Sequence, residues 1–311
     1  MKIIYNDSKG HIFTGIISIF IISFFIIAIL LINMNYFIKS ENNEIIANDN
    51  LKYITEDYIK NIEILSYDTL EEISENAVKS KNPVQDVNKE FKKVLNDKLA
   101  QKNIEYNNLY NVNIVSDVIS IENGDKPEFL KVKVFLNIKK ENNEFNEIID
   151  TKTTVLNLKD PLGLLLCEGS TYNETNVIYE DSLSNYLSNR NIENSEHYIN
   201  ATGPLNIKKC PYDPYIHHGD NQTLSDCIKN GYYHESSDGS CYLCRLEAKS
   251  TCPHYGFETF IIPRDNLSNN LSSVSSSDHV VFFENYPGNS YNYSDSRIIF
   301  LDNSHRLKYG L

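Results

Sequence analysis

Six cysteines are the residues of this 311-residue sequence whose type and spacing most directly point to chemistry. Their even number, in a chain that other features place outside the cytoplasm, is typical of a disulfide framework. Disulfides would stabilise a C-terminal half in which aliphatic residues are sparse. We therefore expect three disulfides, with a pairing that the sequence leaves open, and no cofactor. The cysteines are Cys167, Cys210, Cys227, Cys241, Cys244 and Cys252.

Structural zinc is the alternative to disulfides. In the segment CYLCRLEAKSTCPH, two cysteines separated by two residues form the usual zinc knuckle, and a third cysteine and a histidine follow. The zinc-binding set would be Cys241, Cys244, Cys252 and His254. Its members could be completed or replaced by Cys210, His217, His218 or His234. A redox-active dithiol at Cys241 and Cys244 is a further interpretation, since closely spaced cysteines can have lowered thiol pKa values.

The same region holds the residue types of a thiol-dependent or metal-dependent hydrolase. The spacings H-E-x-x-H and G-x-S-x-G do not occur in the sequence, and His234-Glu235 has no second histidine four residues further on. We therefore expect no enzymatic activity and no catalytic residues. An exterior metal- or thiol-dependent enzyme that uses the segment from Cys210 to His254 is the alternative.

An apolar segment near the N-terminus determines where these residues would fold. Residues 12–32 carry no charge, and 16 of the 21 are Ile, Leu or Phe. As a helix the segment would span roughly 32 Å, close to the thickness of bilayer hydrocarbon, and its side chains favour insertion by about 5 to 10 kcal/mol. The exit at Leu31-Ile32-Asn33 lacks the small residues of a signal-peptidase site. We expect a retained transmembrane helix over residues 11–38.

The charges that flank this segment predict its orientation. Lys2, Lys9 and the α-amino group precede the segment, whereas Lys39 after it is accompanied by Glu41 and Glu44. An excess of positive charge on the N-terminal side places that side in the cytoplasm. The expected location is the cell membrane, which the chain crosses once, with its C-terminal part extracytoplasmic.

The leader and the apolar helix together resemble the class III signal of archaeal type IV pilin-like proteins. The leader, residues 1–10, is short and polar, ends in Lys9-Gly10, and is followed directly by the uncharged helix. The resemblance implies that a prepilin peptidase cuts between Gly10 and His11, after which the helix packs with others into a filament or remains in the membrane. Gly15 stands where many members of this family carry a glutamate. A plain single-pass anchor with an uncut leader is the alternative.

Residues 42–160 are expected to form an α+β domain next to the membrane. Apolar residues first recur every three or four positions, which predicts two helices separated at Asn82-Pro83. The period then changes to two, which predicts a three-stranded antiparallel meander packed against a helix, with a turn at Asn123-Gly124-Asp125. The expected helices cover residues 51–77 and 84–99, and the expected strands cover 112–121, 130–138 and 147–158.

Residues 161–311 are expected to form a β-rich distal domain that contains all the cysteines. Fourteen of the 21 tyrosines lie here, and tyrosine provides rigid contact area with a polar tip, which is typical of a surface that binds a glycan or a surface protein. Two strands are expected over 278–283 and 296–301, after an exposed loop over 266–278. The domain carries six glycosylation sequons, at Asn173, Asn200, Asn221, Asn266, Asn270 and Asn292.

Charge excludes one class of partner. Lys and Arg total 29 against 42 Asp and Glu, a net charge of −13, whereas binding to phosphate backbones needs a positive surface. We therefore expect no nucleic acid partner. The expected partners are the lipid bilayer, other copies through the membrane helix, and a glycan or surface protein. The sequence as a whole predicts an α+β, membrane-anchored structural or adhesive surface protein, of which a pilin-like subunit is one form.

Overall fold

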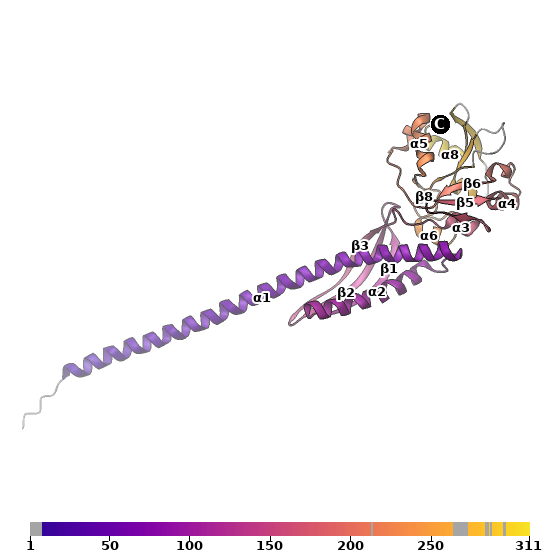
Figure 1. Ribbon diagram of the computed structural model, residues 1–311. Coiled ribbons are helices and arrows are strands. Elements are labelled where there is room, and N and C mark those ends of the chain that lie inside the picture. The colour runs from indigo at the N-terminus through magenta and orange to yellow at the C-terminus, as the bar shows by residue number, and fades with distance from the viewer. Residues whose placement is uncertain (1–7, 213, 264–272, 284–285, 287, 295–296) are drawn as a thin grey trace, which may run out of the picture.

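The computed structural model describes residues 8–212, 214–263, 273–283, 286, 288–294 and 297–311 of the chain. One long helix runs into a body of mixed helix and sheet, so the molecule is elongated (Figure 1). The α+β class expected from the sequence is confirmed, and the N-terminal helix is apolar.

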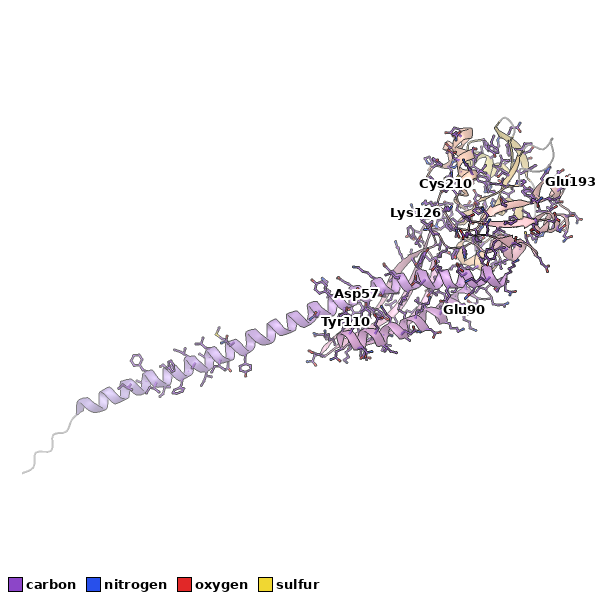
Figure 2. The ribbon with its side chains drawn as sticks, in the orientation of Figure 1. Asp57, Glu90, Tyr110, Lys126, Glu193 and Cys210 are labelled. Atoms are coloured by element: carbon purple, nitrogen blue, oxygen red, sulfur yellow. The ribbon has the colours of Figure 1, made fainter. Side chains whose placement is uncertain are left out.

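Helix α1 continues without interruption from Ser8 to Ser80, a span of 73 residues and about 110 Å. The sequence predicted a membrane helix and a separate amphipathic helix, whereas the structure joins the two. No glycine or proline occurs between Gly15 and Pro83, so nothing interrupts the backbone hydrogen bonds of the helix. The described side chains from Ile17 to Tyr36 project away from the rest of the protein (Figure 2).

The predicted break at Asn82-Pro83 separates α1 from a second helix, as expected. Helix α2, Val87–Tyr110, begins at Asp86, whose carboxylate accepts a hydrogen bond from the Lys89 amide at 2.9 Å. The helix ends at Asn111, which has the left-handed conformation (φ 52°) common at helix C-termini.

The predicted antiparallel meander is confirmed. Strand β2 pairs with both β1 and β3, and its buried and less buried residues alternate along its length. Gly124 in the first turn is required by close approach, because an added Cβ would lie 2.5 Å from the carbonyl oxygen of Phe129. The strands are β1 (Asn113–Asn123), β2 (Phe129–Lys140) and β3 (Asn143–Thr154).

Helices α1 and α2 pack against this sheet to form the main core. Tyr58 and Ile62 of α1 and Phe91 and Leu95 of α2 are fully buried in it. The same core includes five residues of the distal half, so the two halves of the body are packed together rather than joined by a linker. These residues are Ile207, Tyr233, Tyr242, Leu246 and Phe257.

The distal half is built from short elements. Its strands form a three-stranded sheet β4-β5-β6, a hairpin β7-β8 and a four-stranded sheet β11-β12-β10-β9. The helices are α3 (Leu162–Leu166), α4 (Ser182–Ser188), α5 (Asn221–Asn230), α6 (Tyr242–Leu246), α7 (Asp278–Phe282) and α8 (Asn303–Lys308), with 3-10 turns η1 (Ser195–Tyr198) and η2 (Tyr215–Gly219). The strands are β4 (Thr171–Tyr172), β5 (Asn176–Glu180), β6 (Ala201–Pro204), β7 (His234–Ser236), β8 (Gly256–Glu258), β9 (Phe260–Ile261), β10 (Ser273–Ser277), β11 (Asn289–Ser294) and β12 (Arg297–Leu301).

The C-terminal segment corrects two predictions and confirms one. The strand expected over 278–283 is helix α7, because the Asp278 carboxylate bonds the Arg245 guanidinium and the Thr259 amide and turns the chain there. Part of the expected exposed loop is the buried strand β10, whose parallel partner is β12. The strand expected over 296–301 is confirmed as β12.

Candidate metal centres

All six cysteines are free thiols in the structure, so the three disulfides expected from the sequence are absent from it. The cysteines fall into a group of three, a pair and one isolated residue rather than into three pairs. The isolated residue is Cys167, which lies in a hydrophobic cluster where burial raises the pKa of its thiol. The pair and the group of three each lie beside histidines.

The first group, called here the Cys2His2 cluster, is fully buried and brings four donor atoms to within 4.8 Å of one another. Its members come from four short segments. Cys210 follows a bridge between Lys209 and Tyr233, His218 lies in η2, Cys227 in α5, and His234 opens β7. The cluster therefore consists of Cys210, His218, Cys227 and His234.

Distances within the Cys2His2 cluster are close to those of a tetrahedral metal site. Cys210 Sγ lies 3.4 Å from Cys227 Sγ and 3.5 Å from His218 Nε2, and the two histidine Nε2 atoms are 3.3 Å apart. Zinc bonds of about 2.3 Å to sulfur and 2.0–2.1 Å to nitrogen imply tetrahedral ligand separations of roughly 3.3–3.8 Å. The Cys227 Sγ to His234 Nε2 distance, 2.8 Å, is shorter than this range.

Neighbouring groups set the protonation of the four donors. His218 Nδ1 donates to the Tyr215 carbonyl oxygen at 2.7 Å, which leaves the lone pair on Nε2, the atom that faces the thiols. Burial lowers the pKa of His234, so its ring is neutral. A hydrogen bond from Cys227 lowers the pKa of Cys210 to about 3, and the sharing of that proton raises the pKa of Cys227. Neutral imidazole and thiolate are the forms that bind metals.

The second group, called here the Cys3His cluster, is the zinc-binding set predicted from the sequence, and the structure brings its four members together. Cys241 precedes α6 and Cys244 lies within it, whereas the other two members lie in the loop before β8. His254 Nδ1 is 3.5 Å from Cys241 Sγ and 3.8 Å from Cys244 Sγ. The Cys241 amide donates to Cys252 Sγ at 3.3 Å.

The Cys3His cluster is more open to solvent than the Cys2His2 cluster. Cys252 is half-buried and His254 is exposed, whereas Cys241 and Cys244 are buried. Hydrogen bonds from Cys241 and Cys244 lower the pKa of the Cys252 thiol, and this sharing raises the pKa of Cys244. This cluster also contains a thiolate that is ready to bind a cation.

The two clusters lie at opposite ends of the hairpin β7-β8. His234 opens β7, and the segment that connects β7 to β8 carries the whole Cys3His cluster. Each cluster offers four protein donors, which fills the coordination of a tetrahedral zinc ion and leaves no position for water or substrate. The chemistry available at both clusters is therefore structural metal binding rather than metal-assisted hydrolysis.

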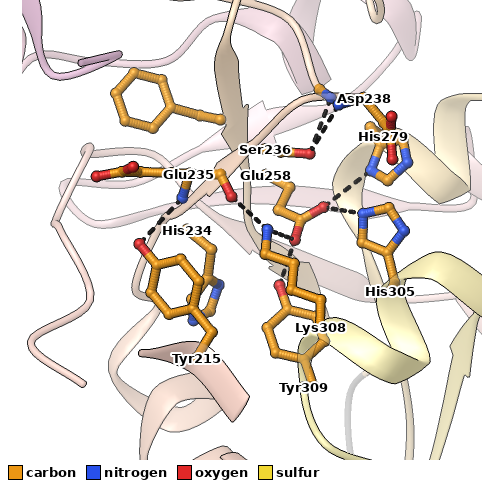
Figure 3. A network of polar contacts seen from close by, with 12 residues as sticks. Tyr215, His234, Glu235, Ser236, Asp238, Glu258, His279, His305, Lys308 and Tyr309 are labelled. Carbon is orange, nitrogen blue, oxygen red and sulfur yellow. Dashed lines mark hydrogen bonds and ion pairs between the residues drawn. The ribbon is translucent and has the colours of Figure 1, made fainter. Parts of the chain in front are cut away.

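A third polar cluster adjoins the Cys2His2 cluster and behaves differently (Figure 3). Glu258 of β8 is fully buried; its Oε1 accepts from Lys308 Nζ at 2.6 Å and from the Tyr309 hydroxyl, and its Oε2 faces His279 and His305. Burial would raise the pKa of Glu258, but Lys308 and His305 outweigh this effect and lower it. His279, His305 and Asp238 also offer three clustered donor atoms. The carboxylates of Glu258 and Asp302 already lie against both histidines, so these rings have polar partners without a metal.

The remaining predicted sites are distributed over the chain. Asn173, Asn200 and Asn292 are exposed, Asn221 opens α5, and Asn266 and Asn270 lie outside the described residues. Gly10 and His11 lie in the first turns of α1, and residues 1–7 of the leader are outside the described part of the chain. The side chain of His217 is likewise not described.

The Cys2His2 cluster is not predicted as a set by the sequence. Cys210, His218 and His234 are expected only as substitutes in the other cluster, and Cys227 only as a disulfide cysteine. The four donors are separated by seven, eight and six residues, and no short knuckle marks them. A signal did exist, because two cysteines and two histidines occur together between Cys210 and His234, in a segment that is poor in aliphatic residues.

The chain has one helix that is long and apolar enough to cross a membrane by length and composition, within the part that the structure describes. Its 18-residue window Ile19–Tyr36 has a mean hydropathy of 2.3, and none of its side chains is buried. Comparison of the chain with family models, with curated proteins and with solved structures finds no match.

Proposed function

We propose that the protein is a membrane-anchored, extracytoplasmic structural or adhesive surface protein with the architecture of a pilin-like subunit. In this proposal α1 crosses the membrane with its N-terminus inside and continues outward as the stem of the body. The distal half carries the surface that meets a glycan or a surface protein, and a zinc ion in the Cys3His cluster stabilises it.

One observation carries the proposal: a single helix has two surroundings along its length. Between Ile17 and Tyr36 the described large apolar side chains are 45 to 76% exposed, which in water would expose a large apolar area. From Leu51 onward most apolar side chains of the same helix are built into the core, and Tyr53 and Ile64 are exceptions that stay exposed. An apolar surface of this extent needs lipid or other helices to cover it.

The arrangement of the body agrees with the resemblance stated above. In Figure 2 the labels of Asp57 and Tyr110 mark the region where α1 lies beside α2, and the helix extends free of the body over the described side chains from Ile17 to Tyr36. A helix that is free in its N-terminal part and packed on an antiparallel sheet in its C-terminal part can serve as a membrane anchor. It can equally serve as one of the packed helices in the core of a filament. Both roles use the same exposed face.

Membrane anchoring is tested by placing charge on that face. The double variant Ile22→Lys and Ile26→Lys adds two ammonium groups at a cost of roughly 5–7 kcal/mol, enough to cancel most of the insertion energy. We expect the wild-type chain in the membrane fraction and the double variant largely released from it. The matched control is Ile64→Lys, which changes a residue of α1 that is 58% exposed but outside the apolar window. Equal membrane retention of all three chains would contradict the proposal.

Pilin-like processing is tested separately by the mass of the mature chain. We expect cleavage between Gly10 and His11, abolition of cleavage by Gly10→Leu, and normal cleavage of the control Gly15→Ala. Electron microscopy of the cell surface should show filaments for the wild type and none for Gly10→Leu. A membrane-bound chain with an intact leader and no filaments would establish the plain anchor and refute the pilin-like role.

A further inference from the structure

We propose that the Cys2His2 cluster is a second structural zinc site, and that the metal it holds takes the place of a hydrophobic core in the segment from Cys210 to His234. This inference goes beyond the proposed function and does not depend on membrane anchoring or filament formation. It rests on the charge, burial and spacing of four side chains that come from four separate segments.

The first argument is geometric. Of the four separations between donor atoms given above, three are 3.3 to 3.5 Å and lie in the range of the edges of a tetrahedron around zinc. The fourth, from Cys227 Sγ to His234 Nε2, is shorter. Both histidines present Nε2 to the centre, and the Nδ1 of His218 is fixed by the Tyr215 carbonyl oxygen. In a metal-binding histidine, the ring nitrogen that does not bind the metal usually donates its hydrogen to an acceptor of this kind.

The second argument is electrostatic. A zinc ion with two thiolates and two neutral imidazoles has no net charge, whereas one with three thiolates and one imidazole has a charge of about −1. A neutral complex can be buried at little desolvation cost, but a charged one is better placed near water. The structure follows this rule, because all four members of the Cys2His2 cluster are buried and the Cys3His cluster is partly exposed.

The third argument concerns what else could hold this segment. Among the side chains that the structure describes between Cys210 and His234, the buried aliphatic ones are Leu224 and Ile228, which belong to a small cluster with aromatic residues of the C-terminal segment. The ring of Tyr309 lies against both ligand histidines, with centroids 5.6 Å from His218 and 5.2 Å from His234. A metal ion here would hold η2, α5 and β7 together. It would also fix the two histidine rings against which Tyr309, the residue after α8, packs.

When zinc binds, the two cysteine thiols lose their protons. Zinc displaces the protons that remain on Cys210 and Cys227, at most two, and forms two bonds to sulfur and two to nitrogen. No oxidation is involved, so the site requires that the thiols stay reduced until the metal is bound.

The test is the metal content of the full chain, purified in detergent with zinc present. We expect two zinc ions per wild-type chain, one for Cys210→Ser/Cys227→Ser, and one for Cys241→Ser/Cys244→Ser. The matched control is Cys167→Ser, which removes a buried cysteine outside both clusters and should retain two ions. One ion per wild-type chain, unaffected by Cys210→Ser/Cys227→Ser, would overturn the proposal and leave the Cys3His cluster in place.

A second measurement on the wild type covers the case in which the variants do not fold. X-ray absorption at the zinc edge should report five sulfur and three nitrogen donors over the two sites, which is the composition of the two clusters together. Three sulfur donors to one nitrogen would mean that only the Cys3His cluster binds metal. An intact mass two hydrogens lighter, from a Cys210–Cys227 disulfide, would also refute the inference.

Discussion

The proximal unit, formed by α1 from Leu51, α2 and the sheet β1-β2-β3, and the distal unit, residues 161–311, are stabilised by different means. In the proximal unit long elements bury aliphatic and aromatic side chains at regular intervals. In the distal unit the elements are short and several of the most deeply buried side chains are polar or charged. The first unit is held by packing, and the second depends on whether its buried polar groups are satisfied.

Arg245 of α6 illustrates the distal case. Its side chain is 1% exposed and bonds Asp160 and Asp278, and the Tyr233 hydroxyl donates to the same Asp160 carboxylate at 2.9 Å. The Glu258 cluster is a second example that supplies its own cations. The two cysteine clusters are the exceptions, because they gather thiols and histidine rings with no Lys or Arg among their members. This contrast is what favours metal at the cysteines and none at Glu258.

The largest expected effect is produced by metal removal. Structural zinc contributes about 10–16 kcal/mol of apparent binding energy in small zinc domains, which exceeds the stability of most single domains. A strong chelator should therefore unfold the distal unit and leave the proximal sheet folded. Hydrogen exchange with mass spectrometry should show loss of amide protection in α5, β7 and β8 and retained protection in β2. Unchanged protection throughout the distal unit would contradict the proposed metal sites.

Removal of the buried cation is the next test. Arg245→Met keeps the side-chain volume but leaves the carboxylates of Asp160 and Asp278 buried without their partner, which should cost about 3–5 kcal/mol. Urea unfolding of the full chain in detergent measures the change. The matched control is Lys79→Ala, which breaks a surface pair with Glu75 and should have little effect on stability. Metal content is measured in parallel, since Arg245 follows Cys244.

The proximal unit is tested by a cavity in its core. Phe91 is fully buried between α2 and the sheet, so Phe91→Ala should cost about 3–5 kcal/mol without changing the metal content. The control Ile104→Ala lies on the same helix but removes a side chain that is 64% exposed, and it should have little effect. A Phe91→Ala protein that loses metal as well would mean that the shared core makes the two units one cooperative unit.

The difference between the units also explains what could be predicted from sequence. The helix break at Pro83 and the three strands of the meander follow from local periods of 3.6 and 2 and from proline, so they were recovered. The continuity of α1 from Ser8 to Ser80 was not predicted, because charged and polar residues separate its two apolar segments and interrupt the hydrophobic pattern. The absence of glycine and proline between Gly15 and Pro83 is the sequence feature that indicates one continuous helix.

In the distal unit long-range contacts override local patterns. The stretch DHVVFF has the apolar residues of a strand, although polar and apolar residues do not alternate in it. It forms α7 instead, and its first residue, Asp278, bonds the buried Arg245 33 residues earlier. The Cys3His set was recognisable from a local knuckle. The Cys2His2 set was not recognisable, because its members come from four separate segments that only the tertiary fold brings together.

The smallest effect we predict comes from a single proton in the Glu258 cluster. Burial opposes the charged form of His305, but Glu258 and Asp302 outweigh it and raise the pKa of His305 to about 9. His279 and Lys308 face the same carboxylate. Because the folded-state pKa lies above the unfolded value of about 6.5, the ion pair stabilises the fold fully below that pH, by about 3 kcal/mol, and this contribution is lost as the pH rises through about 9.

The variant His305→Gln isolates this contribution, since it removes the charge and keeps a polar side chain near Glu258. At saturating zinc, the free energy of unfolding of the wild type should exceed that of His305→Gln by about 3 kcal/mol at pH 6, and the difference should shrink by most of that amount above pH 9. Lys308 pairs with the same Glu258 carboxylate and is left in place by the substitution. A difference that stays the same from pH 6 to pH 10 would show that His305 acts by packing against His279, at a centroid distance of 4.2 Å, and not by its charge.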